Sequence, residues 1–411
     1  VWRAAAWDLR LALLLMRVKQ QAERGEGLNE ARAAWLDLLP QSFDTPIHWS
    51  QEELMLTRYP TLVEAVGKQR ELWADHHRSV AKAATAMQEQ ASPDADASAS
   101  PLRPPTPEEM TWALSCVRSR AFSGPVTGTL KSAVTQLGFA GFLGLTSILT
   151  GFLEPQQAVD GVSVVAVSLV FSDVVASRFA RGKRHVLCPY LDMLNHASSL
   201  GGSRLAYEYF ADSFTASLDP KARPVRKGEQ VMISYGERSN DQLLQYYGFV
   251  ETGNPHDAFV LKQEDFLLAL AEAKPFSPSR LQRLKEAKVA DPTARITLER
   301  DGSGARALQV ARLLYLEEDI IVEDGARAAE DAQGAHSEKT VRGAIALAAK
   351  LLLSKLEARE DPTKAGNGRA AGRGFGKNDD KAVASGARAL ALAFRAEKAA
   401  VLRDCIAVLE R

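Results

Sequence analysis

The sequence has no excess of charge and very little cysteine. Lys and Arg together number 51, as do Asp and Glu, so the 411-residue chain is formally neutral at pH 7. A protein that binds nucleic acid through phosphate contacts usually carries a basic surplus, so nucleic acid is not favoured as a partner. The three cysteines, Cys116, Cys188 and Cys405, form no CxxC pair, no zinc spacing and no disulfide framework. Three isolated thiols are typical of a reducing compartment.

The first residues lack the marks of a targeting segment. The chain begins with Val1, and residues 1–19 read as an amphipathic helix without a small-residue cleavage site or a Ser-rich leader. Residues 132–153 lack charge altogether, which raises a membrane span as one interpretation. Four glycines interrupt that run and no basic flank orients it, so we favour buried core or a poorly ordered insertion; no membrane partner is expected.

Helix signals cover most of the chain, and strand signals are few. Residues 1–87 read mainly as helix, and Ser50 with Glu53 forms a capping box. A second helix starts at Thr106 and runs to about Arg120. Further segments are expected as follows: a flexible loop at 88–107, a β-branched buried strand at 162–176 with a helix as the alternative, short strands at 204–211 and 230–235, helices from about 255, and a disordered Gly-rich loop at 362–380.

Three segments carry residue types suited to chemistry. They are Trp112 to Phe122, Pro189 to His196 and Gly228 to Phe249. Taken alone, each segment has an ordinary structural explanation: an Asn-His pair in a turn, a tyrosine that closes a strand, a serine that caps a helix, and an arginine that complements a helix end. No single segment supports a function.

Taken together and in this order, the three segments resemble the SET domain of the Rubisco large-subunit methyltransferase family. The resemblance rests on Ser119-Arg120-Ala121-Phe122, on Asp192-Met193-Leu194-Asn195-His196 and on the run from Gly228 to Phe249. It implies an α+β protein with a β-rich SET fold and helical insertions, followed by an all-helical C-terminal substrate-binding domain. The implied boundaries are 1–252 for the SET domain, with a helical insertion at about 1–122 and the C-terminal part of the core at about 162–252, and 255–411 for the helical domain.

The resemblance also implies roles for individual residues. It makes S-adenosylmethionine the cofactor and the lysine of a folded, non-histone protein the methyl acceptor. Tyr235 takes the catalytic position at the base of the lysine channel. The implied cofactor-binding residues are Ser119, Arg120, Asn195, His196 and Phe249, of which Arg120 suits the cofactor carboxylate because a guanidinium can grip it with two hydrogen bonds. The implied substrate-binding residues are Asp192, Tyr207 and Tyr247.

Two departures from the family pattern bear on these expectations. No Gly-x-Gly segment of the kind that touches the cofactor precedes Trp2, which implies a chain incomplete at its N-terminus or impaired in cofactor binding. The stretch between Phe122 and Leu187 is longer than the family pattern. Two other functions therefore stay open: a non-catalytic SET-fold scaffold, and a protein-histidine methyltransferase. We expect a monomer in the chloroplast, with cytoplasm and nucleus as alternatives.

Overall fold

The computed structural model describes most of the chain in two compact units. Unit 1 comprises residues 1–40 and 83–235, and unit 2 comprises residues 41–82 and 236–411. The residues described are all except 1–4, 26, 90–102, 126–129, 153, 180–182, 199–202, 209–212, 219–223, 317–331 and 359–378. Most of the predicted loops at 88–107 and 362–380 therefore lie outside the described residues. The units are defined by packing, and the predicted domain boundary near residue 252 stays a prediction.

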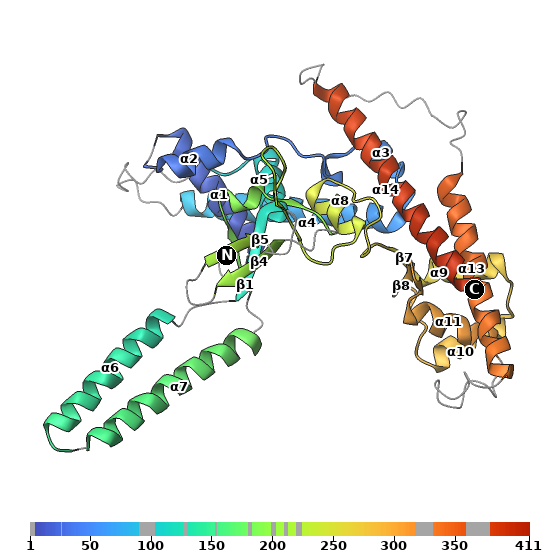
Figure 1. Cartoon of the computed structure of the whole chain (residues 1–411). Coiled ribbons are helices and arrows are strands. Elements are labelled where there is room, and N and C mark those ends of the chain that lie inside the picture. The colour runs from blue at the N-terminus through green and yellow to red at the C-terminus, as the bar shows by residue number, and fades with distance from the viewer. Residues whose placement is uncertain are drawn as a thin grey trace. The chain divides into compact units, whose positions relative to one another are not determined.

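Unit 1 combines helices with short strands (Figure 1). Helix α1 packs against α5 and β2. Its helices are α1 (Trp7–Glu23), α2 (Glu30–Asp37), α5 (Pro107–Arg120), α6 (Leu130–Leu149), α7 (Pro155–Phe179) and the 3-10 turn η3 (Leu191–Met193). The buried faces of α1 and α5 include Leu9, Ala12 and Leu114, so burial of apolar side chains holds the two helices together.

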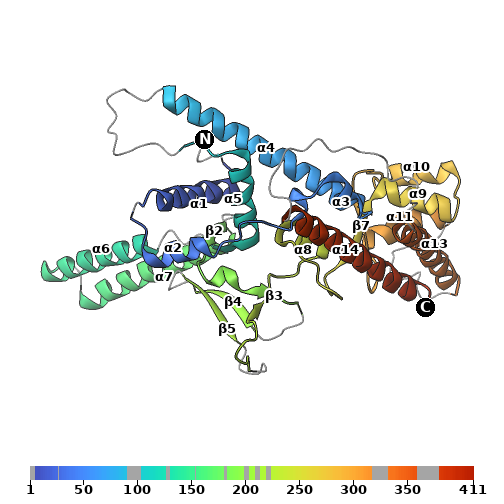
Figure 2. The same ribbon diagram turned by 90° about the horizontal axis from the view of Figure 1, so that it is seen from above.

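The strands of unit 1 form three pairs. Strands β1 (Ala121–Pro125) and β2 (Lys183–Leu187) are antiparallel, as are β4 (Ser203–Glu208) and β5 (Ser213–Leu218). Strand β3 (Asn195–His196) runs parallel to β6 (Met232–Ile233). Because parallel strands cannot be joined by a tight turn, the chain passes through β4 and β5 between them (Figure 2). Residues around Asn195 are thereby brought beside the strand that leads to Tyr235.

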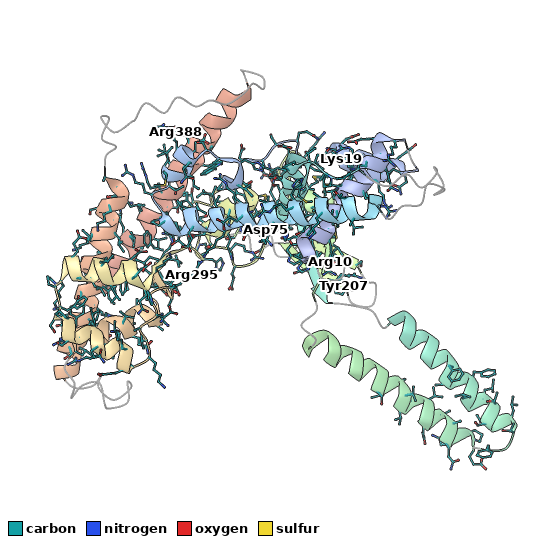
Figure 3. The ribbon with its side chains drawn as sticks, turned by 180° about the vertical axis from the view of Figure 1, so that it is seen from behind. Arg10, Lys19, Asp75, Tyr207, Arg295 and Arg388 are labelled. Atoms are coloured by element: carbon teal, nitrogen blue, oxygen red, sulfur yellow. The ribbon has the colours of Figure 1, made fainter. Side chains whose placement is uncertain are left out.

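Helices α6 and α7, which lie between β1 and β2 in the sequence, pack side by side as a hairpin (Figure 1). This corrects two expectations. The segment 162–176 is helical, because a Val-rich run of this kind also suits a helix when a second apolar helix covers one side of it. In the uncharged run at 132–153, the side chains that the structure describes, from 138 to 152, do not form a buried core. Its exposed apolar side chains include Phe139, Phe142, Leu149 and Phe152, and Figure 3 draws the side chains of the outer part of this hairpin.

Unit 2 contains the other helices and a three-stranded antiparallel sheet in the order β7-β8-β9. Its helices are η1 (Pro46–His48), α3 (Gln51–Met55), α4 (Pro60–Glu89, whose residues from 83 onward belong to unit 1), α8 (Asn240–Tyr247), α9 (Gln263–Ala273), α10 (Pro278–Glu286), α11 (Ala305–Tyr315), α13 (Ala332–Glu357) and α14 (Asp379–Leu409). The strands are β7 (Ala258–Lys262), β8 (Arg295–Glu299) and β9 (Gly302–Ser303). The α+β class is confirmed, and the sheet is an addition to the helical C-terminal region that the sequence did not indicate.

Local signals explain where several helices begin and end. The expected capping box at Ser50 is present, and the helix that was expected to start at Thr106 has one as well. The Ser50 and Thr106 hydroxyls each accept a backbone N–H, and the side chains of Glu53 and Glu109 accept the backbone N–H of Ser50 and Thr106. Helix α8 ends at Gly248, whose φ of 77° lies in the left-handed region that glycine adopts without strain. A Cβ at Gly248 would also lie 3.4 Å from the carbonyl carbon of Asp44. Within the described part of the chain, no helix has the length and hydropathy of a membrane span.

Candidate active site

Three contacts fix Tyr235 beside the paired strands β3 and β6 of unit 1. Its backbone N–H donates to Nδ1 of His196 over 3.0 Å, and its hydroxyl donates to the carbonyl oxygen of Leu194 over 2.7 Å. Its ring also stacks on the His196 ring, with 5.0 Å between centroids and 26° between planes. The structure therefore brings together the predicted catalytic tyrosine and the predicted cofactor-binding histidine.

The hydrogen bonds of His196 indicate the tautomer of a neutral ring. Because Nδ1 accepts the backbone N–H of Tyr235, the proton of a neutral ring belongs on Nε2, which lies 3.1 Å from the Ser198 hydroxyl. His196 is buried, whereas its neighbour Asn195 is exposed and donates through Nδ2 to Oε1 of Gln230 over 2.8 Å. The histidine thus has a structural partner on each ring nitrogen, and the asparagine side chain stays accessible.

Arg120 ends α5 and reaches the turn that precedes β3. Its guanidinium donates to the carbonyl oxygen of Asp192 over 2.8 Å. Its Nε is buried and has no hydrogen-bond partner among the described residues. Leaving a buried charged donor unpaired is costly, so such a group requires an explanation such as a missing ligand. An anionic oxygen would satisfy it, as a carboxylate does when it meets an arginine fork.

Two other predicted site residues near Arg120, Asp192 and Ser119, have hydrogen-bond partners within the protein. The Asp192 carboxylate is buried and accepts the indole N–H of Trp35 at 3.0 Å; burial raises the pKa of this carboxyl. Ser119 donates within its own helix, to the carbonyl oxygen of Ser115 over 2.8 Å. A substrate contact for Asp192 and a cofactor contact for Ser119 stay predictions. Sequence reasoning missed Trp35, because nothing in α2 marks it as a partner of a residue 157 positions away.

Tyr207 belongs to an aromatic cluster beside β1. Its ring meets Phe214 edge-on at 5.2 Å, and Phe214 lies 5.6 Å from Phe122. A Cβ at Gly124 would lie 3.0 Å from Phe214 and 3.3 Å from Tyr207, so a larger residue at this position would require both rings to shift slightly. Tyr207, labelled in Figure 3, is half-buried, which leaves part of its surface free to line a channel.

The remaining two predicted residues, Tyr247 and Phe249, lie in unit 2 on either side of Gly248. Their rings contact edge-on, with centroids 6.4 Å apart, and both are half-buried. The structure therefore groups Tyr235 with His196, Arg120 with the turn before Asn195, and Tyr247 with Phe249. Among the described residues, no three His, Cys, Asp or Glu side chains are arranged to hold a metal ion.

Comparison with known proteins defines the class. No family model matches the chain. The chain is 24% identical over 312 residues to [fructose-bisphosphate aldolase]-lysine N-methyltransferase, chloroplastic, of Arabidopsis thaliana, covering 74% of this chain and 49% of the relative. It is 22% identical over 254 residues to the chloroplastic Rubisco large-subunit N-methyltransferase of Pisum sativum, covering 60% and 38% respectively. The chain thus spans half or less of the length of these two relatives.

The fold has a counterpart among solved structures. The crystal structure of the SET domain of LSMT bound to lysine and AdoHcy matches with a TM-score of 0.52 at 19% identity, over 99% of this chain and 76% of that one. The chain therefore has the fold of a SET domain. It is a relative of the SET-domain lysine methyltransferases of the Rubisco large-subunit methyltransferase type, which confirms the resemblance found in its sequence.

Proposed function

We propose that this protein is an S-adenosylmethionine-dependent protein-lysine N-methyltransferase that acts on a folded, non-histone protein. Two observations carry the proposal. Tyr235 has a fixed position beside the paired strands β3 and β6, and the Nε of Arg120 is buried without a partner among the described residues. The named activities of the relatives, which methylate lysines, support the same reaction class. The non-catalytic scaffold is the alternative that the experiment below tests.

The residues present fit the proposed cofactor. The bound cofactor supplies an electrophilic methyl group on a sulfonium. Arg120 would hold its carboxylate and thereby satisfy the buried Nε. Asn195, whose side chain is exposed, and His196 would contact the adenosine part. Phe249 would supply the flat apolar neighbour that the adenine needs, and Ser119 would assist near the carboxylate.

Tyr235 would act on the acceptor amine. Its hydroxyl donates to the Leu194 carbonyl, and a tyrosine oxygen that donates its proton can also accept an amine N–H and orient the amine. A lysine with a pKa of ~10.4 is neutral in only about one molecule in a thousand near pH 7.5. An apolar channel disfavours the charged form, and half-buried Tyr207 and Tyr247 are suited to line one. Alignment of the two reactants then supplies much of the rate enhancement.

The substrate would be a plastid protein. Both relatives described above carry chloroplastic names, and one acts on aldolase and the other on the Rubisco large subunit. We propose that the helical C-terminal region from 255 onward docks the folded substrate, that Asp192 lies toward the substrate side, and that the enzyme works as a monomer in the chloroplast.

The test is methyl transfer from labelled S-adenosylmethionine to purified aldolase and Rubisco, followed by mass spectrometry of the modified residue. Tyr235→Phe should reduce the rate by about 10²- to 10³-fold, as expected when one polar group at the reacting centre is removed. It should leave cofactor affinity nearly unchanged. Tyr190→Phe is the matched control, because its hydroxyl also donates to a backbone carbonyl, that of Ala31 at 2.9 Å, and its side chain is exposed.

Three results would contradict the proposal or a part of it. Cofactor binding without transfer to any protein lysine would favour the scaffold. An equal loss of rate in Tyr235→Phe and Tyr190→Phe would remove the catalytic role of Tyr235. Transfer to a histidine in place of a lysine would keep the enzyme and change its acceptor.

A further inference from the structure

Unit 2 contains a lysine that is completely removed from solvent. Lys398, on α14, has an exposed fraction of 0%. Lysine is almost never fully buried unless its charge is paired. Its ammonium group also lies 5.1 Å from the ring centroids of both Tyr59 and Phe394. A cation in such an enclosed position must be stabilised by the groups that contact it.

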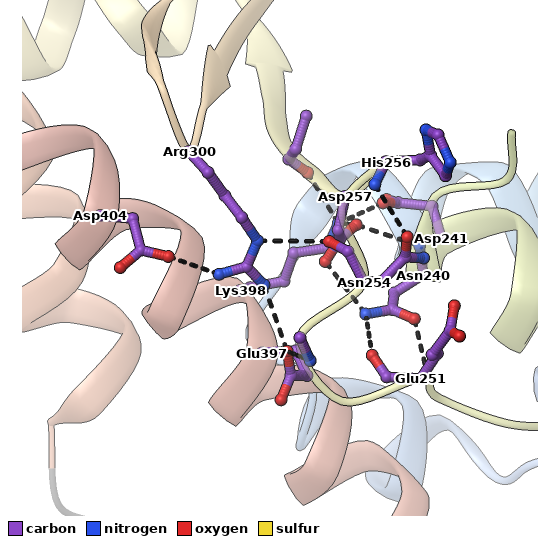
Figure 4. A network of polar contacts seen from close by, with 12 residues as sticks. Asn240, Asp241, Glu251, Asn254, His256, Asp257, Arg300, Glu397, Lys398 and Asp404 are labelled. Carbon is purple, nitrogen blue, oxygen red and sulfur yellow. Dashed lines mark hydrogen bonds and ion pairs between the residues drawn. The ribbon is translucent and has the colours of Figure 1, made fainter. Parts of the chain in front are cut away.

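Each proton of the Lys398 ammonium has an acceptor. Nζ donates to Oδ1 of Asp257 over 2.7 Å, to the carbonyl oxygen of Ala258 over 2.7 Å, and to Oδ2 of Asp241 (Figure 4). An ammonium has three protons and no acceptor site, so its hydrogen-bonding capacity is filled by these three contacts. Asp241 lies in the first turn of α8, whereas Asp257 and Ala258 lie at the start of β7.

A second layer of contacts extends from Asp257 to the segment after α8. The Asp257 carboxylate accepts the backbone N–H of Asn240 over 3.0 Å and its Nδ2 over 3.2 Å. Asn240, which is also fully buried, pairs with both backbone groups of Glu251: Nδ2 donates to the carbonyl oxygen over 3.0 Å, and Oδ1 accepts the N–H over 2.9 Å. The first residue of α8 is therefore tied to a residue two positions beyond Phe249.

Glu397, the residue before Lys398, also contacts the stretch that begins at Asn240. Oε2 of Glu397 accepts the backbone N–H of Gly253 over 2.9 Å and a guanidinium N–H of Arg300 over 3.2 Å. The stretch from Asn240 to Ala258 is thus fixed at its beginning and at its end by two adjacent residues of α14 (Figure 4). Tyr247 and Phe249 lie inside this stretch.

We propose that Lys398 is a positioning residue for the reaction: through Asp241 and Asp257 it fixes the stretch 240–258 and so sets the placement of Tyr247 and Phe249. This inference rests on the proposed function, because the roles of Tyr247 in the lysine channel and of Phe249 beside adenine belong to that proposal. It gives α14 a role in holding the stretch 240–258, in addition to any contact of that region with a substrate.

The experiment compares Lys398→Met with Arg403→Met. Arg403 lies on the same helix and pairs with Glu357, but its side chain is 56% exposed, so the control removes one cation from α14 without opening a buried network. Two quantities are measured on folded protein: hydrogen exchange of the amides in 240–258, and the KM for S-adenosylmethionine with the kcat. Lys398→Met should raise both the exchange rate and the KM by about tenfold or more, equivalent to ~1.4 kcal/mol, while Arg403→Met changes neither.

Two further variants keep the test decisive. If Lys398→Met does not fold, Asp241→Asn replaces an acceptor whose side chain is 19% exposed and should give a smaller change in the same direction. Lys398→Arg retains the cation and should recover part of the exchange protection and of the KM. Folded Lys398→Met or Asp241→Asn with unchanged exchange and unchanged KM would overturn the inference. A wild-type protein without methyl transfer would refute the proposed function alone, since hydrogen exchange still decides whether Lys398 fixes the segment.

Discussion

Two cations, the fully buried Lys398 in unit 2 and the half-buried Arg120 in unit 1, are paired to different extents. The Lys398 ammonium of unit 2 has an acceptor for each of its three protons. The Arg120 guanidinium of unit 1 donates to the Asp192 carbonyl but keeps a buried Nε without a partner in the described part of the chain. A complete network stabilises the structure around it, whereas an open donor is free for a ligand. We therefore expect Lys398 to stabilise the stretch 240–258 within unit 2, and Arg120 to bind a ligand in unit 1.

The largest expected effect is on the stability of unit 2. Asp257→Ala would remove one partner of Lys398 and leave that charge buried with fewer acceptors, so we expect a loss of ~3–5 kcal/mol in the free energy of unfolding. Asp404→Ala is the matched control. Its carboxylate pairs with Arg300 in the same network but is 52% exposed, and such pairs contribute ~0–1 kcal/mol. Chemical denaturation measures both; similar losses for the two variants would show that burial does not set the importance of these contacts.

A smaller effect is expected from replacing Arg120. It concerns the affinity for the cofactor and not the stability of the fold. Arg120→Met should weaken the affinity for S-adenosylmethionine by about 10- to 100-fold, the loss of a charge-assisted hydrogen-bonding pair. The melting temperature should fall little, because the variant also removes an unpaired buried donor. Arg118→Met, which removes a cation near Asp8 one half-turn earlier, controls for the loss of charge from α5. Equal cofactor affinity in Arg120→Met and the wild type would refute the carboxylate role.

The smallest effect is expected from removing the hairpin of α6 and α7. Pro125 pairs with Lys183, so the ends of β1 and β2 are neighbours that a two-residue Asn-Gly turn can join in place of residues 126–182. The helices pack mainly on each other, so the free energy of unfolding should change by less than ~0.5 kcal/mol. Binding of an apolar fluorescent dye should decrease, because exposed Phe142 and Phe152 are removed. A large loss of stability would show that the hairpin supports the rest of unit 1.

The sequence predicted local features well and long-range pairing poorly. The capping boxes at Ser50 and Thr106 were predictable because each signal lies within four residues. For the uncharged run at 132–153, buried core was one of two interpretations and was wrong, since apolar composition alone does not show what covers a helix. The contact of Trp35 with Asp192 and the network around Lys398 join residues more than 100 positions apart, and no residue type or spacing announces them.

The site residues show the same division. The motif around Asn195 and the motif around Tyr235 were recognisable from their order in the chain. Their meeting depends on the parallel pairing of β3 with β6, two strands of two residues each that local propensity does not specify. The carbonyl of Leu194, which receives the Tyr235 hydroxyl, is a backbone group and leaves no mark in the sequence.

The most direct test of the account is a calorimetric titration with S-adenosylmethionine of the wild-type chain and of a variant that combines Asn195→Ala with His196→Ala. Each hydrogen-bonding group of the cofactor that is left unpaired in a closed pocket costs ~1–3 kcal/mol, so the double variant should bind at least about 100-fold more weakly. Circular dichroism establishes that the variant is folded. The account predicts binding by the wild type and none detectable in the folded double variant. Equal affinity in the two proteins, or no binding by the wild type, would contradict the claim that the paired strands β3 and β6 form the cofactor site.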